Sequence, residues 1–191
     1  MTVARSLNCD GAYAWGLAAA VALLLLPLLG GQALREAWRY ERAAVAGGQW
    51  WRLITCHLVH LDATHALLNS VGLALLWALF AREYRVRQWL LALVASAISI
   101  AAGFWFFSPH LQWYVGASAL LHGAFACGCA ALIRKGDRVG LLAGVVFVAK
   151  LTWEQWHGPL PFETTGQVVT ISHLYGAIGG ALAGALLRPR A

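Results

Sequence analysis

The sequence carries little charge. Asp, Glu, Lys and Arg make up 12% of its 191 residues, which is about half the fraction in a typical soluble domain. Apolar residues make up 60% of the chain and the mean hydropathy is +0.65, which excludes an ordinary soluble globular protein. Apolar runs of about 20 residues recur instead, and a run of that length can cross a bilayer as a helix. We therefore expect residues 1–191 to form one integral membrane domain that lies in the lipid bilayer.

The sequence also lacks the cysteine and histidine patterns of a disulfide or metal protein. Its four cysteines are Cys9, Cys56, Cys127 and Cys129. The last two lie inside an apolar run, where small core residues are more typical than a redox or metal pair. His57, His60 and His65 have the spacing H-x2-H-x4-H, but beyond Cys56 and Asp62 no carboxylate or thiolate set accompanies them, and there is no H-E-x-x-H motif. We expect no metal and no cofactor, and we expect His60 to hydrogen-bond loop backbone.

The formal net charge of +6 would suit a protein that binds nucleic acid. However, the basic residues stand in short clusters between the apolar runs, as loop charges that set membrane topology do. We therefore expect no nucleic-acid partner.

Six apolar runs predict six transmembrane helices. They lie at about 13–31, 65–81, 89–107, 116–133, 139–153 and 171–187, with a long outer connection at 32–64. Nine basic residues fall on the side of the two termini: Arg5, Arg82, Arg85, Arg87, Arg134, Lys135, Arg138, Arg188 and Arg190. The opposite side has five: Arg35, Arg39, Arg42, Arg52 and Lys150. The positive-inside rule then places both termini in the cytoplasm.

This topology brings polar residues of three helices to one depth. Spans 2, 4 and 6 all begin on the outer side, and their first turns contain His65 and Asn69, Ser118 and His122, and His173 respectively. Polar residues inside a membrane are costly and tend to face one another or a water-filled cavity. We therefore expect these residues to form one site near the outer face.

The residues at this site suit acyl transfer. A serine becomes a nucleophile when a base lies within hydrogen-bond reach, and a neutral imidazole suits that role. Ser118 follows Gly116-Ala117 at the start of a helix, where unpaired backbone N–H groups and the helix dipole favour an oxyanion. His65 and Asn69 are spaced i, i+4, so that both project from one face of span 2 and can donate to the same oxyanion. Alternatively, Ser118 bonds back to its own helix, and His65 and Asn69 only hold helices together.

Either His173 or His122 can serve as the base. His122 shares a helix face with Ser118 but is poorly placed to approach the hydroxyl and still leave it able to attack. His173 begins span 6, which carries Gly176, Gly180 and Gly184 at four-residue spacing. Small residues at this spacing let helix backbones approach closely, so that span 6 can pack on span 4. We favour His173 as the base.

These residues carry a resemblance to the rhomboid intramembrane serine proteases, and it covers nearly the whole chain. The matching motifs are the GQWWR segment at 48–52, HLVHLDATHALLN at 57–69, G-x-S at 116–118 and H-x-x-G at 173–176. The resemblance implies an all-α membrane protein, a six-transmembrane-helix rhomboid-like bundle with a Ser–His dyad and no acidic third member. It also implies that Ser118 is the nucleophile, that His173 is the general base, and that His65, Asn69 and the Ser118 N–H form the oxyanion hole.

Two positions depart from the usual rhomboid pattern. Alanine stands at 119 where G-x-S-G has glycine, and His122 stands where an aromatic residue usually stacks on the base. The string GASALLHG is similar to the rhombosortase subfamily. That similarity implies substrates that bear a C-terminal Gly-Gly-containing motif, one membrane span and a basic tail. It further implies a place in a bacterial inner membrane with the site facing the periplasm, and a role for His122 in stacking on His173 or in contacting substrate.

Span 5 is the weakest of the six runs, because Lys150 and Glu154 interrupt it. At i, i+4 spacing the two can pair with each other, and we expect them to snorkel outward from the bundle. Three alternatives to a rhombosortase-like enzyme remain: a rhomboid that cleaves other single-span proteins, an inactive protein that binds membrane helices, and a small transporter. The retention of Ser118 and His173 speaks against the second, and the lack of an inverted repeat speaks against the third.

Overall fold

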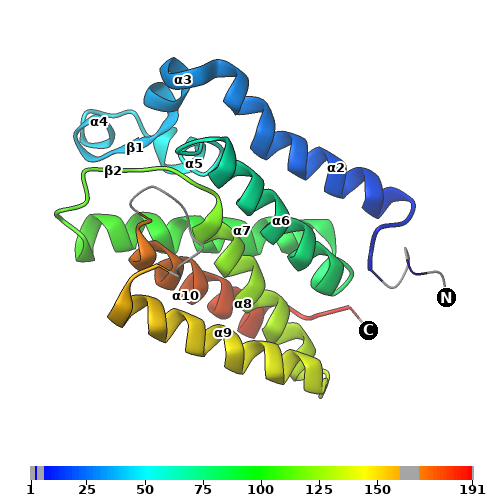
Figure 1. Ribbon diagram of the computed structural model, residues 1–191. Helices are drawn as coiled ribbons and strands as arrows, with labels where there is room; N and C mark the ends of the chain where they lie inside the picture. Colours follow the sequence, from blue (N-terminus) through cyan, green and yellow to red (C-terminus); the bar gives the residue numbers. More distant parts are fainter. Residues whose placement is uncertain (1–2, 4–6, 160–167, 191) are drawn as a thin grey trace. The chain divides into compact units, whose positions relative to one another are not determined.

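The computed structural model describes residue 3, residues 7–159 and residues 168–190. Arg5, which is one of the nine basic residues assigned to the cytoplasmic side, lies outside these residues. Within them the chain is mostly helical (Figure 1), and it divides into two compact units, which are considered one at a time. The first unit comprises Met1–Leu79 and Ala101–Ser118, and the second comprises Phe80–Ile100 and Ala119–Ala191.

A helix is present at each of the six predicted positions. The first is the run of α2, the 3-10 helix η1 and α3, with bounds Ala12–Leu25, Leu26–Gly30 and Gly31–Trp38. The others are α6 (Ala63–Phe80), α7 (Val86–Ala102) with the π-helical turn η2 (Gly103–Phe107), α8 (Ser118–Arg134), α9 (Arg138–His157) and α10 (Thr170–Leu186). By length and composition, three stretches of the described chain qualify as membrane spans: Ala12–Trp38, Ala63–Phe80 and Val86–Phe107. The count of six spans and the cytoplasmic termini stay predictions.

In the first unit, the connection between α3 and α6 has a structure of its own. It contains the strand β1 (Tyr40–Glu41), α4 (Arg42–Ala46) and α5 (Arg52–Thr55). β1 pairs antiparallel with β2 (Trp113–Tyr114), so that Tyr40 lies opposite Tyr114. The guanidinium of Arg42 donates to the carbonyls of Phe104 and Trp105, each at 2.9 Å. Since β2 ends four residues before Ser118, this pairing fixes the chain that leads to the predicted nucleophile.

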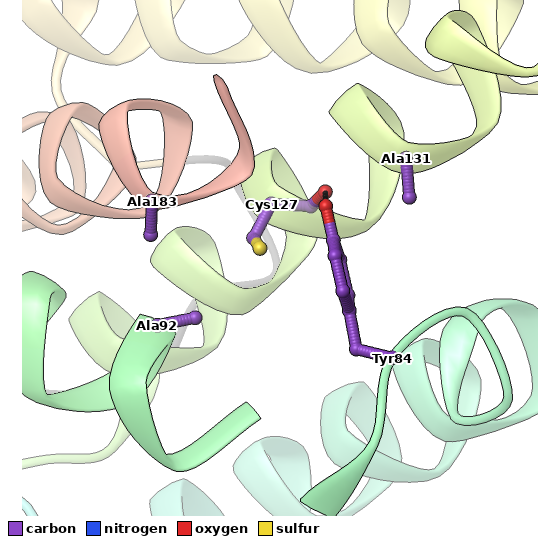
Figure 2. Close-up of a cluster of buried hydrophobic side chains, with 5 residues drawn as sticks. All are labelled: Tyr84, Ala92, Cys127, Ala131 and Ala183. Atoms are coloured by element: carbon purple, nitrogen blue, oxygen red, sulfur yellow. Dashed lines mark hydrogen bonds between the residues drawn. The ribbon is translucent and has the colours of Figure 1, made fainter. Parts of the chain in front are cut away.

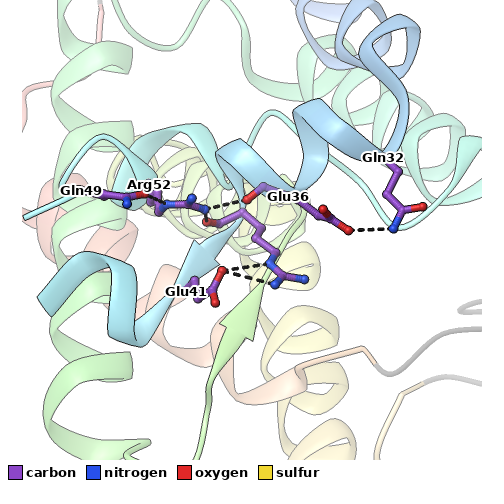
Figure 3. Close-up of polar contacts among 6 residues, drawn as sticks. Gln32, Glu36, Glu41, Gln49 and Arg52 are labelled. Carbon is purple, nitrogen blue, oxygen red and sulfur yellow. Dashed lines mark hydrogen bonds and ion pairs between the residues drawn. The ribbon is translucent and has the colours of Figure 1, made fainter. Parts of the chain in front are cut away.

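Arg52 holds this connection together from the inside (Figure 3). Its guanidinium is buried and donates to the Glu36 carbonyl at 2.7 Å, to the Arg39 carbonyl at 2.9 Å and to the Gln49 side chain at 2.7 Å. The two carbonyls lie at the C-terminal end of α3, where backbone oxygens have no partner within the helix and the dipole favours a cation. The planar fork of arginine can reach several acceptors at once, which the compact ammonium of lysine cannot.

In the second unit, α10 packs on α8 through its glycines. A Cβ on Gly176 would overlap the carbonyl oxygen of Ala119, and a Cβ on Gly180 would overlap the carbonyl oxygen of Gly123. At the other end of the pair, the Arg134 guanidinium donates to the Gly184 and Leu187 carbonyls at the end of α10. The two helices therefore run parallel with their backbones in contact, which is the packing that the glycine spacing predicts.

The core of the second unit is built from small residues around Cys127. The members drawn in Figure 2 are Tyr84, Ala92, Cys127, Ala131 and Ala183. The Tyr84 hydroxyl donates to the Cys127 carbonyl at 3.4 Å, and the cysteine side chain lies among the three alanines. Cys127 and Cys129 are both buried and not disulfide-bonded, so they act as the small core residues that their apolar surroundings predict.

Replacing Arg52 by alanine should lower the free energy of unfolding by about 3 kcal/mol, because the Glu36 and Arg39 carbonyls and the Gln49 side chain lose a buried charged donor. Arg52→Lys should lose less, since one ammonium can still reach part of the set. The matched control is Arg39→Ala, which removes a partly exposed ion pair with Glu41 and should cost at most about 1 kcal/mol. Chemical denaturation in detergent would measure all three, and equal effects of Arg52→Ala and Arg39→Ala would contradict the structural role of Arg52.

Candidate active site

Hydrogen bonds hold the backbone of Gly116, two residues before Ser118. Its N–H donates to the Cys56 carbonyl at 2.9 Å. Its carbonyl accepts the Tyr114 hydroxyl at 2.8 Å and lies 3.3 Å from Nδ1 of His57. A carbonyl only accepts, so the hydrogen of the His57 ring is on Nδ1. The loop before the predicted nucleophile is therefore anchored to the turn that follows α5.

Gly116 also brings His65 and Ser118 to the same point. Its φ is +123°, a conformation that side chains disfavour. A Cβ placed on it would lie 2.9 Å from Cε1 and 3.2 Å from Nε2 of His65, and 3.9 Å from Oγ of Ser118. The glycine thus leaves room for the His65 imidazole near the Ser118 hydroxyl, within the first unit.

His65 is oriented by two contacts with the residues before α6. Its backbone N–H donates to the carboxylate of Asp62 at 2.8 Å. Asp62 thereby caps the N-terminus of α6 with its side chain. The ring Nδ1 of His65 accepts the Leu61 N–H at 3.4 Å. With Nδ1 as acceptor, the hydrogen of a neutral ring is on Nε2, which a Cβ on Gly116 would approach to 3.2 Å. His65 therefore presents a donor to the space beside Ser118, as an oxyanion hole requires.

Asn69 lies one turn further along α6 and is buried. Its side-chain nitrogen donates one hydrogen to the His65 carbonyl at 3.0 Å. The amide carries a second hydrogen, so the geometry is compatible both with a helix-stabilising role and with the predicted oxyanion contact.

The ring of His60 does not hydrogen-bond the loop backbone as the sequence predicted. Both ring nitrogens are buried without a hydrogen-bond partner, and the ring makes an edge contact with His65 at 5.2 Å between centroids. The expectation that His60 bonds loop backbone is therefore wrong. Its place is that of a packing residue behind His65.

Four polar side chains of α8, α9 and α10 form a closed cluster in the second unit: His122, Lys150, Glu154 and His173. Nδ1 of His173 lies 3.1 Å from both carboxylate oxygens of Glu154. The ammonium of Lys150 lies 2.5 Å from Glu154 and 2.6 Å from Nε2 of His122. The rings of His122 and His173 stack at 4.0 Å with an angle of 5°. We call this set the polar cluster.

The polar cluster corrects one expectation. Lys150 and Glu154 do pair, but Glu154 is only 1% exposed and points into the unit rather than outward. The Glu154 carboxylate also contacts His173, a contact that the sequence did not predict. The predicted topology offered a signal, because it places the end of span 5, and with it Glu154, at the depth of the first turns of spans 4 and 6.

The tautomers in the polar cluster distinguish the two candidate bases. A carboxylate only accepts, so Nδ1 of His173 carries the hydrogen and Nε2 is the basic nitrogen of the neutral ring. An ammonium only donates, so the basic nitrogen of His122 is already engaged with Lys150. His173 is therefore the better base. The structure also shows the stacking contact that was one of the two roles expected for His122.

Among the described residues, His122, Glu154 and His173 offer the one grouping of side chains that could hold a metal ion. Their ligand atoms lie within 4.8 Å of one another. However, the Lys150 ammonium is in contact with two of the three and supplies the positive charge that such a group needs. We therefore assign charge compensation at this cluster to Lys150.

Gly116→Ala should remove reaction of Ser118 with a fluorophosphonate, a reagent for activated serines. The new methyl group would strain the backbone and displace the His65 ring. Gly136→Ala is the matched control, because Gly136 has a φ of +76° but open space around its Cβ. Equal labelling of the two variants would show that the contact with His65 is not what requires glycine.

The stability of the protein should fall as the pH drops from about 6.5 to 4. Burial lowers the pKa of His57 to about 4, so the folded state keeps this ring neutral while the unfolded state takes up a proton near pH 6.5. The full effect is about 3 kcal/mol. His57→Asn, which keeps a donor for Gly116, should flatten the pH dependence measured by denaturation in detergent. An unchanged slope would contradict this assignment.

Comparisons with known proteins bear directly on these motifs. A model of the rhomboid domain matches residues 47–190, a stretch that contains the Gly116 loop and the polar cluster. The chain is 28% identical over 138 residues to YdcA of Bacillus subtilis strain 168, whose name describes it as a candidate rhomboid protease; the match covers 72% of this chain and 67% of YdcA. It is 30% identical over 83 residues to the rhomboid protease GluP of the same organism, across 44% of this chain and 16% of GluP. No solved structure matches significantly.

The family model covers well over half of the chain and ends beyond α10. Both relatives are named for the same kind of enzyme. The chain therefore belongs to the rhomboid family, the family of intramembrane serine endopeptidases.

Proposed function

We propose that the chain is an intramembrane serine protease in which Ser118 is the nucleophile and His173 is the general base. The observation that carries this proposal is the contact between the starts of α8 and α10. Ala119, which is bonded directly to Ser118, has its carbonyl against Gly176, one turn after His173. Since the basic nitrogen of His173 is Nε2, transfer of the Ser118 hydroxyl proton to this atom is the first step of the proposed reaction.

The proposed reaction has two halves. Ser118 Oγ bonds to the carbonyl carbon of the scissile peptide, its proton passes to His173 Nε2, and the carbonyl electron pair moves onto oxygen. His65 Nε2–H, the second amide hydrogen of Asn69 and the Ser118 N–H are the donors proposed for this oxyanion. The C–N bond then breaks and His173 returns its proton to the leaving amine. Water attacks the acyl-enzyme in the second half, with the same base.

We further propose that the substrates are exported proteins with a C-terminal Gly-rich motif, one span and a basic tail. A helical peptide bond is shielded by its own hydrogen bonds, so a substrate must unwind before its carbonyl can be attacked. Gly-Gly sequences lower the cost of unwinding, because glycine is a poor helix former. The resemblance of GASALLHG to the rhombosortase branch supports the same substrates. On this proposal the protein lies in a bacterial inner membrane with its site toward the periplasm.

A general rhomboid protease that cleaves other single-span proteins is the main alternative, and a reporter assay separates the two. A secreted reporter with a C-terminal Gly-Gly motif, one span and a basic tail would be co-expressed with wild type or with Ser118→Ala. We expect release by wild type only. The matched substrate control replaces Gly-Gly by Leu-Leu, which should reduce release at least about tenfold because the helix resists unwinding.

The outcomes are distinct. Release that is equal for both substrates and depends on Ser118 would leave the protease but overturn the Gly-rich specificity. Equal release by wild type and Ser118→Ala would overturn the nucleophile. No Ser118-dependent cleavage of any single-span protein would favour an inactive helix-binding protein instead.

A further inference from the structure

We infer that Glu154 is a positioning residue for the proposed base, His173, and that Lys150 is the counter-ion of this buried carboxylate. The inference rests on the proposed function and deepens it. Glu154 does not touch the reacting atoms. It acts through His173 by fixing which ring nitrogen holds the hydrogen and by stabilising the positive ring that forms during attack.

The geometry of the pair supports this role. Both carboxylate oxygens of Glu154 lie 3.1 Å from Nδ1 of His173, and both side chains are almost fully buried. The carboxylate can only accept, so it excludes the tautomer in which Nδ1 is the basic nitrogen. Without this contact a neutral imidazole could place its hydrogen on Nε2, where it could not take a proton from serine. The contact therefore selects the reactive form of the ring.

A second argument comes from the cost of burying Glu154. An ionised carboxylate in an apolar interior is strongly unfavourable unless it is paired and hydrogen-bonded. The Lys150 ammonium, one turn away on the same helix, lies 2.5 Å from the Glu154 carboxylate and compensates its charge. If the ion pair served packing alone, Glu154 would need no further partner. Glu154 nevertheless directs both oxygens to His173 on another helix. An arrangement that uses a costly charge to orient one imidazole is typical of an active site.

His122 contacts the face of the His173 ring. The two rings stack with an angle of 5°, and Nε2 of His122 accepts from Lys150. Lys150 thus contacts two residues that orient the His173 ring, Glu154 at the edge and His122 on the face. Rotation of the ring away from this orientation would break the contact with Glu154.

The proton movements balance without any exchange with Glu154. During attack Nε2 of His173 gains the proton of the Ser118 hydroxyl, and Nδ1 keeps its own. The ring is then an imidazolium whose positive charge faces the carboxylate at Nδ1. When the leaving amine takes the proton from Nε2, the ring returns to the same neutral tautomer. Glu154 stays ionised throughout.

Three variants test the inference in the reporter substrate assay with purified protein. Glu154→Gln removes the charge and should lower kcat by about 10²- to 10⁴-fold while apparent KM changes little, because the buried Glu154 is proposed to act through His173 and not on the substrate. Glu154→Asp keeps a carboxylate and should recover part of that loss. Lys150→Gln with Glu154→Gln removes the buried pair together, so that no charge is left uncompensated. It should fold with a Tm near wild type and still show the loss in kcat.

The controls separate this inference from the proposed function. Wild type and Ser118→Ala are measured alongside, and an absence of Ser118-dependent cleavage would overturn both. If wild type cleaves and the folded double variant keeps kcat within about threefold, Glu154 is not a positioning residue and only the inference falls. If all three variants lose activity in proportion to a lowered Tm, with no recovery by aspartate, the pair is structural and the inference also falls.

Discussion

The backbone contact between α8 and α10 is the constraint on which the second unit depends. Within a membrane, apolar side chains gain little by leaving lipid, so helices associate through close packing and polar contacts. At Gly176 and Gly180 even one methyl group would overlap a carbonyl of α8. This proximity puts His122 and His173 in stacking distance and leaves α9 to supply the charged pair. The catalytic chemistry proposed for the cluster therefore rests on the absence of side chains one turn away.

The first unit solves a different problem, because its site is built on a loop. A loop beside a reacting group must be rigid, and here rigidity comes from three hydrogen bonds to the backbone of one residue, Gly116. The strand pair and Arg42 fix the chain before it, while Arg52 holds the connection from which His57 comes. Few of these contacts involve the predicted catalytic residues. The connection between α3 and α6 thus anchors the backbone around Gly116.

Much of this could be predicted from the sequence. Hydropathy placed the six helices to within a few residues at most ends, although the first helical run extends to Trp38. Counting spans predicted that α8 and α10 would run parallel, and the glycine spacing predicted their packing. These succeeded because they depend on periodicity and chain direction, which are properties of whole segments.

The rest could not be predicted, for physical reasons that differ. An i, i+4 pair such as Lys150 and Glu154 lies on one helix face, but spacing does not say whether that face points inward. A two-residue strand pair is too short to show alternation. The lack of a hydrogen bond at the ring nitrogens of His60 and the three hydrogen bonds of Gly116 depend on where loops meet, which no local pattern encodes.

The shared contacts of Lys150 have an evolutionary consequence. A substitution of Glu154 alone would leave the Lys150 ammonium beside His122 without its carboxylate, and a substitution of Lys150 alone would leave the buried carboxylate without its ammonium. Either single substitution leaves one charge of the pair uncompensated, whereas the loss of both residues leaves the net charge of the interior unchanged. These two positions should therefore change together among descendants of this sequence, so that a lineage either keeps the charged pair or has replaced it as a unit.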